Sequence, residues 1–242
     1  MTQPIIQLSE IHKSYETGEL KQEVLKDLSL EISKGSMTAV MGPSGSGKTT
    51  LLNIVGLLDQ DYTGEYLLDG MNMDQLSGRE AGKIRSRKIG FVFQSFHLMK
   101  DLTVLENVRM AAVIANSLKP VRERIPKKQL TERSCQLLER FGLKDQILQK
   151  TWQLSGGQMQ RAAMARALMN DPELILADEP TGALDMKNSA EIMDIFEELH
   201  REGKTLLIVT HNEKVAACCD QVIELSDGQV IRPGGSLPGQ ER

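Results

Sequence analysis

The sequence lacks the long apolar runs that a membrane-spanning helix needs. Its longest runs, TLLIV at 205–209 and MAAVIA at 110–115, are far shorter than the roughly 20 residues that cross a bilayer. The N-terminus, MTQPIIQLSEI, has no basic start followed by an apolar run and a small-residue cleavage site, so no secretory signal is expected. These absences predict a chain that is soluble by itself.

Cysteine is scarce, and basic residues are not in excess. The three cysteines, Cys135, Cys218 and Cys219, offer neither an even disulfide framework nor zinc-ligand spacing, which indicates reduced thiols in a cytosol. The net charge of −4 argues against a chain that coats nucleic acid, because such chains normally show a basic surface. With 40% hydrophobic and 26% charged residues, the composition is that of an ordinary globular protein with a sizeable core.

Short β-branched runs alternate with helical patterns along much of the chain. Continuous apolar strands in such an alternation predict a mostly parallel sheet covered by helices, which is an α/β fold. Five runs carry this prediction: IIQL near the start, MTAVM at 37–41, IGFVF at 89–93, ELILAD at 173–178 and TLLIVT at 205–210.

Two regions depart from this alternation. The first 35 residues and YLLDGMNM at 66–73 are strand-rich and predict an N-terminal antiparallel β subdomain. Helical patterns without an intervening strand predict an inserted α-helical subdomain; they lie at 103–117, 127–141 and 155–169. We therefore predict a single domain over residues 1–242, with a core at 1–94 and 171–232, a helical subdomain at 95–170 and a flexible tail at 233–242.

One basic cluster stands out, KPVRERIPKKQLTER at 119–133. Isolated charge runs usually only solvate a surface, so the cluster favours a solvated linker between helices. Contact with anionic lipid or with a partner is the alternative. Trp152, the only tryptophan, is expected to contribute to packing.

The octet GPSGSGKT, Gly42 to Thr49, follows a predicted strand and precedes a predicted helix, TTLLNIVGLL. This context makes the pattern GxxxxGK[ST] a P-loop, in which glycines let successive amides and the helix N-terminus face the phosphates. Lys48 would meet the β- and γ-phosphates, and Thr49 would hold Mg²⁺. The predicted nucleotide-binding residues here are Gly42, Pro43, Ser44, Gly45, Ser46, Gly47, Lys48, Thr49 and Thr50.

Two carboxylates follow the apolar strand ELILAD, at the strand end where α/β proteins place ligands. We expect Asp178 to support Mg²⁺, directly or through water. Glu179 is placed to polarise the attacking water as a general base. Without the P-loop, the Asp-Glu pair at this strand end would be interpreted as ordinary capping residues with no catalytic role.

A second predicted helix N-terminus that is suited to bind phosphate occurs a hundred residues after the first, at LSGGQ, Leu154 to Gln158. Ser155 can cap the helix and donate its hydroxyl, and Gly156 and Gly157 permit close backbone approach. The dipole of the helix that follows favours an anion. Nothing nearby completes a catalytic site.

With these motifs the sequence resembles the ATP-binding cassette family, specifically its transporter ATPases, over essentially the whole chain from Tyr15 to about Ile231. Gly42–Thr49 match the Walker A loop, Leu154–Gln158 the signature, and Leu174–Glu179 the Walker B strand. Four further positions are similar to family motifs in the family's order: Gln94 to the Q-loop glutamine, Asp185 in GALD to the D-loop, His211 in VTHNE to the switch histidine, and Tyr15 to the aromatic that stacks on adenine.

The resemblance implies a P-loop NTPase fold and hydrolysis of ATP with Mg²⁺. It also implies that two copies pair head to tail, so that Ser155, Gly156, Gly157 and Gln158 of one copy face the γ-phosphate held by the other. It implies a γ-phosphate sensor in His211, contact of Gln94 with Mg²⁺ or water, and a place for Asp185 at the dimer interface. From the residues alone, Gln94 could simply cap a turn, and Asp185 could cap the helix MKNSAEIMDIFEEL.

The resemblance also implies a partner, because an ATPase without membrane segments needs separate membrane-spanning permease subunits, docked near residues 94–117. The chain would then lie peripherally on the cytoplasmic face of the cell membrane. Within the family it is most similar to the macrolide-export and lipoprotein-release group, in GLLD at 56–59, in 85–108 and in LADEPTGALD at 176–185. Two departures, GALD for GNLD and Asn212 for Asp, leave export of a drug or an antimicrobial peptide at least as well supported as lipoprotein release.

Other functions within the superfamily compete with transport. DNA-repair and chromosome ATPases carry long coiled-coil or zinc insertions, and translation-associated members normally carry two cassettes; this sequence shows neither. A cell-division ATPase that signals through a membrane partner without transport is the closer alternative, because the cargo never touches the cassette.

Overall fold

The computed structural model describes residues 4–18 and 20–235, and it divides the chain into two compact units. Unit 1 combines Met1–Ala81 with Phe196–Arg242, and unit 2 is Gly82–Ile195.

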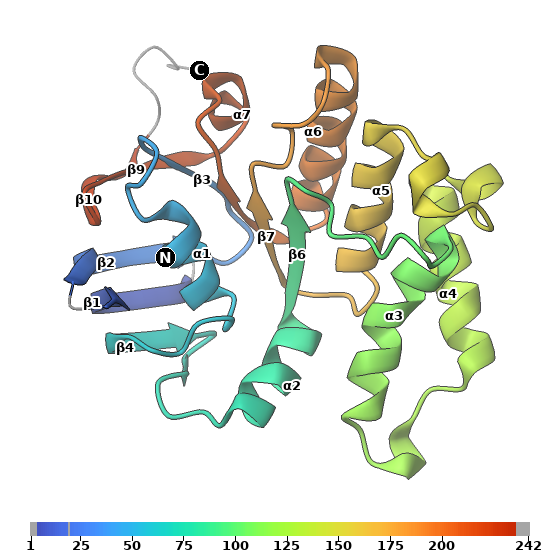
Figure 1. The fold of residues 1–242 in the computed structure, drawn as a ribbon, viewed down its shortest axis with the longest axis horizontal. Coiled ribbons are helices and arrows are strands. Elements are labelled where there is room, and N and C mark those ends of the chain that lie inside the picture. The colour runs from blue at the N-terminus through green and yellow to red at the C-terminus, as the bar shows by residue number, and fades with distance from the viewer. Residues whose placement is uncertain (1–3, 19, 236–242) are drawn as a thin grey trace. The chain divides into compact units, whose positions relative to one another are not determined.

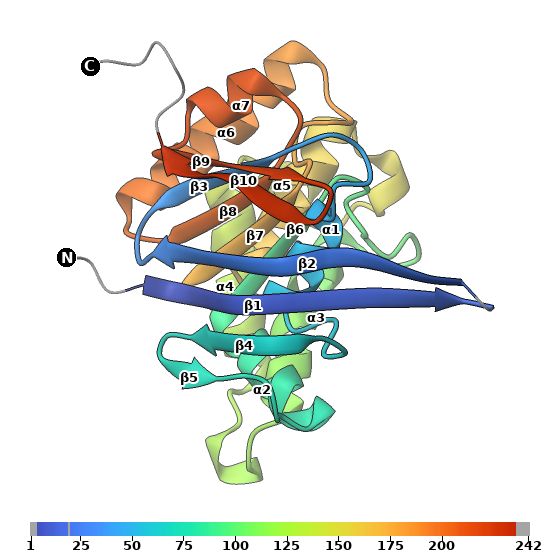
Figure 2. The same ribbon diagram turned by 90° about the vertical axis from the view of Figure 1, so that its left-hand side faces the viewer.

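The first sheet of unit 1 is antiparallel and has the strand order β2-β1-β4-β5. β1 (Pro4–Thr17) and β2 (Leu20–Ser33) form a long hairpin, and β4 (Thr63–Leu68) lies on the other side of β1, followed by the short β5 (Met71–Asn72). Figure 2 shows β1 and β2 side by side along their whole length, with β4 next to β1. The antiparallel β part predicted from the sequence is therefore present.

The second sheet of unit 1 contains β10 (Gln229–Gly235), β9 (Gln221–Ser226), β3 (Met37–Met41) and β8 (Thr205–Val209), in that order. β3 runs parallel to both β8 and β9, and β10 is antiparallel to β9. Every residue of β8 and four of the five in β3 are buried, as expected for parallel strands covered on both faces.

The helices of unit 1 follow strands of the second sheet. α1 (Lys48–Val55) begins directly after the loop that follows β3, and α7 (Glu213–Ala217) follows β8. Two further helices, α2 (Gly78–Lys88) and α6 (Met186–Arg201), extend across the boundaries of the units. On α6, Ile192, Phe196 and Leu199 are buried, and their helical spacing forms one apolar face.

Unit 2 contains a parallel pair of strands, β6 (Ile89–Phe93) and β7 (Leu174–Asp178), and three main helices. The helices are α3 (Val104–Ser117), α4 (Lys127–Arg140) and α5 (Gly156–Ala167), and each packs against the other two (Figure 1). Short 3₁₀ turns lie at Val121–Glu123, Lys144–Gln146 and Thr151–Gln153. The three predicted helical patterns thus correspond to three helices, with ends within two residues of those expected.

The two compact units are bounded at 81/82 and 195/196, and the subdomain bounds expected at 95 and 170 stay a prediction. β6 and β7 pair with each other and α5 packs against β6, so both strands belong to the same compact unit as the helices. The predicted tail, 233–242, begins within β10, and residues 236–242 lie outside the described residues. No helix among residues 4–18 and 20–235 has the length and apolar character needed to cross a bilayer.

Candidate functional site

The loop at 42–47 joins β3 to α1, and its backbone shape depends on glycine. Gly42, Gly45 and Gly47 have φ values of 154°, 81° and 99°, a region that residues with a side chain rarely adopt. Gly47 is the N-cap of α1 and supplies no side chain to the first amides of the helix. These amides therefore remain available to an anion.

Two of these glycines also permit close packing of the loop within unit 1. A Cβ on Gly42 would lie 2.0 Å from the backbone oxygen of Leu225 in β9. A Cβ on Gly47 would lie 2.7 Å from Leu25 Cδ2 in β2. The loop is thus pressed against strands of both sheets, which fixes its path.

The Lys48 ammonium lies over this loop. It donates to the backbone oxygens of Gly42 and Pro43, both at 2.8 Å. A cation held beside open helix amides forms a cradle for an anionic group. Around it the exposed residues are Pro43, Ser44, Gly45 and Thr49, while Ser46, Gly47 and Thr50 are buried and support the loop.

His211 follows β8 and shares a hollow in unit 1 with the start of the loop. The side chain is exposed, so it can reach a ligand there. Asn212, where the family usually has Asp, caps α7 by accepting from the Lys214 amide at 2.9 Å. Asp and Asn cap equally well, so this departure preserves the local structure. The hollow is lined by Met41, Gly42, Pro43, His211, Glu213, Val222, Glu224 and Arg232.

In unit 2, the carboxyl ends of β6 and β7 bring Gln94 and Glu179 to one edge. Phe93, the last residue of β6, pairs with Asp178, the last residue of β7. Gln94 and Glu179 directly follow them and therefore leave the sheet at the same level. Glu179 has a φ of 44°, unusual for a residue with a side chain, and its carbonyl accepts from the Gly182 amide at 3.0 Å. A Cβ on Gly182 would lie 2.7 Å from Gln94 Nε2, so this glycine leaves room for the glutamine.

Ser155 is the N-cap of α5, as the sequence predicted. Its hydroxyl accepts from the Gln158 amide at 3.3 Å, and Gln158 Oε1 accepts from the Ser155 amide at 2.8 Å, which completes a capping box. Gln158 therefore has a structural role that the sequence analysis did not identify. The serine is exposed, and the first turn of α5 carries no acidic residue. This helix start is therefore open to an anion.

The signature glycines contact the start of α6. A Cβ on Gly157 would lie 2.0 Å from Asn188 Oδ1, and one on Gly156 would lie 3.4 Å from Leu184 Cδ2. Asp185 accepts from the Asn188 amide at 2.8 Å, so it caps α6, which was the plainer of its two sequence interpretations. This hydrogen bond is the main cause that lowers the pKa of Asp185.

Two polar residues of α5 near these motifs were missed by the sequence analysis. Gln160 is fully buried, and its Nε2 donates to the Pro180 oxygen, directly after Glu179, at 2.6 Å. Arg166 donates to the backbone oxygens of Phe96 and His97, which follow Gln94, and burial lowers its pKa. A polar residue on the buried face of a predicted helix was the available signal in each case.

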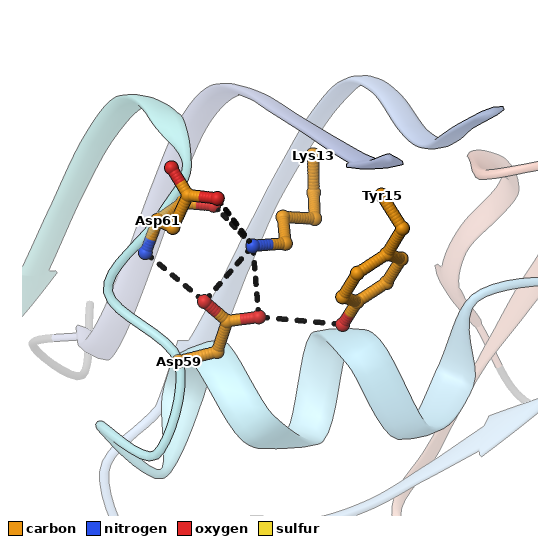
Figure 3. Close-up of polar contacts among 4 residues, drawn as sticks. All are labelled: Lys13, Tyr15, Asp59 and Asp61. Carbon is orange, nitrogen blue, oxygen red and sulfur yellow. Dashed lines mark hydrogen bonds and ion pairs between the residues drawn. The ribbon is translucent and has the colours of Figure 1, made fainter. Parts of the chain in front are cut away.

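Tyr15 lies on β1 in unit 1 and is 41% exposed. Its hydroxyl donates to Asp59 Oδ2 at 3.3 Å, beside the buried Lys13 (Figure 3). The alternation of Ile11 and Lys13 along the strand, both on its buried face, was the signal that this lysine lies inside. The expectation for Trp152 was wrong, because that side chain is 70% exposed.

A family model described as ABC transporter matches residues 25–182. The chain belongs to the ABC transporter family. It is an ATP-binding ATPase of that family, with the P-loop fold and the order of motifs predicted from the sequence.

Curated relatives are similar over nearly the whole chain. The "Macrolide export ATP-binding/permease protein MacB" of Shewanella oneidensis is 44% identical over 240 residues, which are 99% of this chain and 35% of the relative. The chain therefore spans about a third of that protein. The "Uncharacterized ABC transporter ATP-binding protein YvrO" of Bacillus subtilis is 45% identical, with 94% of this chain and 96% of the relative covered.

Solved structures share the fold of this chain. A dimeric structure of a post-hydrolysis state of the ATP-binding cassette MJ0796, bound to ADP and Pi, has a TM-score of 0.87 at 41% identity, covering 97% of this chain and 99% of that one. CbiO1 from Clostridium perfringens, described as part of an ABC transporter complex, has a TM-score of 0.80 at 30% identity, covering 96% and 88%.

Proposed function

We propose that this chain is the ATP-hydrolysing subunit of an exporter and that it drives a separate membrane permease. The observation that carries the proposal is the presence in one chain of two helix starts without acidic residues in their first turns, one at Gly47–Lys48 and one at Ser155. Similarity to macrolide-export and ABC transporter proteins favours transport over the signalling alternative.

The P-loop residues are proposed to bind the triphosphate, with Lys48 shifting from the Gly42 and Pro43 oxygens onto the phosphates. Glu179 is proposed to take a proton from the attacking water as general base, and His211 to sense the γ-phosphate. Tyr15 is proposed to stack on the base. The exposed positions of Tyr15 and His211 support these roles.

Mg²⁺ would be held by Thr49, Gln94 and Asp178, and when bound it would neutralise charge on the phosphates. The donor chemistry fits this ion. Within the described part of the chain, no cluster of three or more His, Cys, Asp or Glu side chains could hold a metal. Mg²⁺ does not require one, because it keeps several waters and binds through one or two carboxylates together with phosphate oxygens.

The second helix start is proposed to act on the nucleotide of another copy. Ser155, Gly156, Gly157 and Gln158 would face the γ-phosphate bound by the partner's P-loop, so that ATP joins two chains and its hydrolysis lets them separate. Asp185 would lie at this interface. The dimeric MJ0796 structure with ADP and Pi supports such a pairing.

The permease is proposed to dock on the helical face formed by residues 94–117. Apolar side chains are exposed there, with Met99, Val113 and Ile114 at 55%, 42% and 53%. A groove on the same face is lined by Leu102, Glu106, Arg109, Met110, Val113, Asn116, Ile125, Lys127 and Leu130. Docking would place the chain peripherally on the cytoplasmic face of the membrane. Residues 121–126, between α3 and α4, are all exposed, in keeping with a solvated linker, whereas residues 127–133 of the basic cluster belong to α4 and correct that part of the expectation.

Affinity purification of the tagged chain from gently solubilised native membranes tests this proposal. We expect mass spectrometry to recover a permease with few spans and a large extracytoplasmic part, whose nature would indicate the cargo. A Val113→Glu variant, changed on the proposed docking face, should keep ATP hydrolysis in solution and no longer recover the permease. Recovery of soluble proteins alone, from the unchanged chain as well as from Val113→Glu, would contradict a transport role.

A further inference from the structure

Lys13 is a buried cation in β1. Its side chain is 3% exposed, and its ammonium contacts Asp59 Oδ1 at 3.0 Å, the Asp61 backbone oxygen at 2.6 Å and Asp61 Oδ2 at 3.1 Å (Figure 3). Burial of a charge is unfavourable unless it is paired and hydrogen-bonded, so this lysine depends on its acidic partners. The two carboxylates differ, because Asp59 is 20% exposed and Asp61 is 95% exposed.

The same cluster holds the ring of Tyr15 at two points. Asp59 accepts the tyrosine hydroxyl at 3.3 Å, and the Lys13 ammonium lies 4.8 Å from the ring centroid. Figure 3 shows the ring beside the lysine, with its hydroxyl directed at the Asp59 carboxylate. An aromatic side chain that is 41% exposed would otherwise rotate about its side-chain bonds.

Two connections relate this ring to the phosphate loop. Asp59 lies just beyond α1, and α1 begins at Lys48, so the cluster and the phosphate loop are at opposite ends of one helix about 12 Å long. Lys13 pairs with Leu25 across the β1–β2 hairpin, and Leu25 packs against Gly47. Both connections fix the distance from Tyr15 to the loop.

We infer that Lys13 and Asp59 are positioning residues that hold the Tyr15 ring ready to stack on the nucleotide base. The inference rests on the proposed function, in which Tyr15 binds the base. A ring already fixed in its binding orientation loses little side-chain freedom when nucleotide arrives, and this raises affinity. Lys13 and Asp59 therefore contribute to affinity for the base and leave affinity for the phosphates unchanged.

The test compares ATP with inorganic tripolyphosphate, which has phosphates and no base, by titration calorimetry on the full chain. Asp59→Asn removes the charge that pairs with Lys13 and replaces one acceptor oxygen by a donor. The side chain can then no longer accept from Lys13 and the Asp61 amide at Oδ1 and also from Tyr15 at Oδ2. We expect about 3- to 10-fold weaker ATP binding, the range for one lost hydrogen bond, with tripolyphosphate binding unchanged. The KM for ATP should rise by the same factor at constant kcat.

Asp61→Asn is the matched control, because it makes the same chemical change at an exposed carboxylate that contacts Lys13 and not Tyr15. We expect it to leave ATP affinity unchanged. On a Tyr15→Phe background, Asp59→Asn should lose most of its effect on ATP affinity, because the hydroxyl through which it acts is gone. Thermal unfolding of each variant verifies folding.

Equal weakening of ATP and tripolyphosphate binding by Asp59→Asn would overturn the inference, as would an unchanged ATP affinity. In either case the proposed stacking role would survive if Tyr15→Ala still weakens ATP binding alone. If Tyr15→Ala leaves ATP affinity unchanged, the stacking role fails and this inference fails with it.

Discussion

Gln160 Nε2 donates a hydrogen bond to the Pro180 backbone oxygen at 2.6 Å, entirely within the core of unit 2. The bond connects the helix that begins at Ser155 to the residue that follows Glu179. It therefore links the two motifs of unit 2 to which the proposed function gives γ-phosphate contact and water activation. The other amide atom, Oε1, is buried without a hydrogen-bond partner in the described part of the chain.

We predict that Gln160→Glu destabilises the protein far more than Gln160→Leu. Leucine removes the bond to Pro180 and also the unpaired Oε1, so the two effects partly offset and the loss should be about 1–2 kcal/mol. Glutamate places a buried carboxylate against a carbonyl oxygen and should lower the free energy of unfolding by at least ~3 kcal/mol. Urea denaturation measures both values, with the exposed Gln136→Glu as control; equal losses would contradict the bond.

Ser155→Ala should suppress ATP turnover while leaving ATP binding by the monomer unchanged. The helix cap also disappears, which lowers stability by about 1 kcal/mol. Thr103→Ala removes an equivalent capping box from α3 and is the matched control, since it should lower stability similarly and preserve turnover of the isolated chain. Steady-state hydrolysis and calorimetry separate these effects. A proportional loss of binding and turnover in Ser155→Ala would exclude action on a partner's nucleotide.

Gly42→Ala and Gly45→Ala should differ although both glycines have positive φ. At Gly42 the new Cβ would meet the Leu225 oxygen at 2.0 Å, and a backbone atom cannot move aside easily. At Gly45 nothing lies within 4 Å, so only conformational strain opposes alanine. Thermal unfolding should show a loss of about 3 kcal/mol or more for Gly42→Ala and about 1 kcal/mol for Gly45→Ala. Similar losses would mean that close packing at Gly42 is unimportant.

The two neighbouring cysteines should react very differently. Burial raises the pKa of Cys219 to about 12, so its thiol stays protonated and unreactive, while Cys218 is exposed. We expect iodoacetamide at pH 8 to modify Cys218 and to spare Cys219 until the protein unfolds, as peptide mass spectrometry can show. Because the folded pKa lies above the unfolded one, this thiol stabilises the fold below pH 9, and its contribution is lost as pH rises toward 12.

Local pattern predicted most of the fold. The apolar runs at 37–41 and 89–93 became β3 and β6 without a shift of either end, and the cap at Ser155 followed from residue type alone. What local pattern could not give depends on residues far apart in the chain. Lys13 meets Asp59 and Asp61, and Gly157 lies against Asn188, because strand pairing and helix packing bring these segments together.

The subdomain bounds expected at 95 and 170 stay a prediction. The composition changes near residue 95, where helices begin, and this change set the prediction. Within unit 2, which starts at Gly82, β6 pairs with β7, a long-range pairing that composition does not reveal. Gly157 also lies against Asn188 of the same chain, whereas the motif alone indicated that this glycine allows close approach of a phosphate.

Glu179→Gln should keep ATP binding and lose hydrolysis by at least the ~10²-fold typical of a missing general base. Glu65→Gln, at an exposed position on β4, is the control and should hydrolyse ATP normally. Lys48→Ala should instead weaken binding and turnover together, because the ammonium is proposed to move onto the phosphates. Calorimetry and phosphate release measure these quantities, and normal turnover in Glu179→Gln would exclude Glu179 as the base.

Light scattering of Glu179→Gln with and without saturating Mg-ATP tests most directly whether ATP joins two copies of this chain. We predict the monomer mass without nucleotide and twice that mass with it. Adding Ser155→Arg to the same chain should return the mass to that of the monomer. A mass that stays monomeric, with ATP binding verified in the same sample, would contradict the proposed pairing.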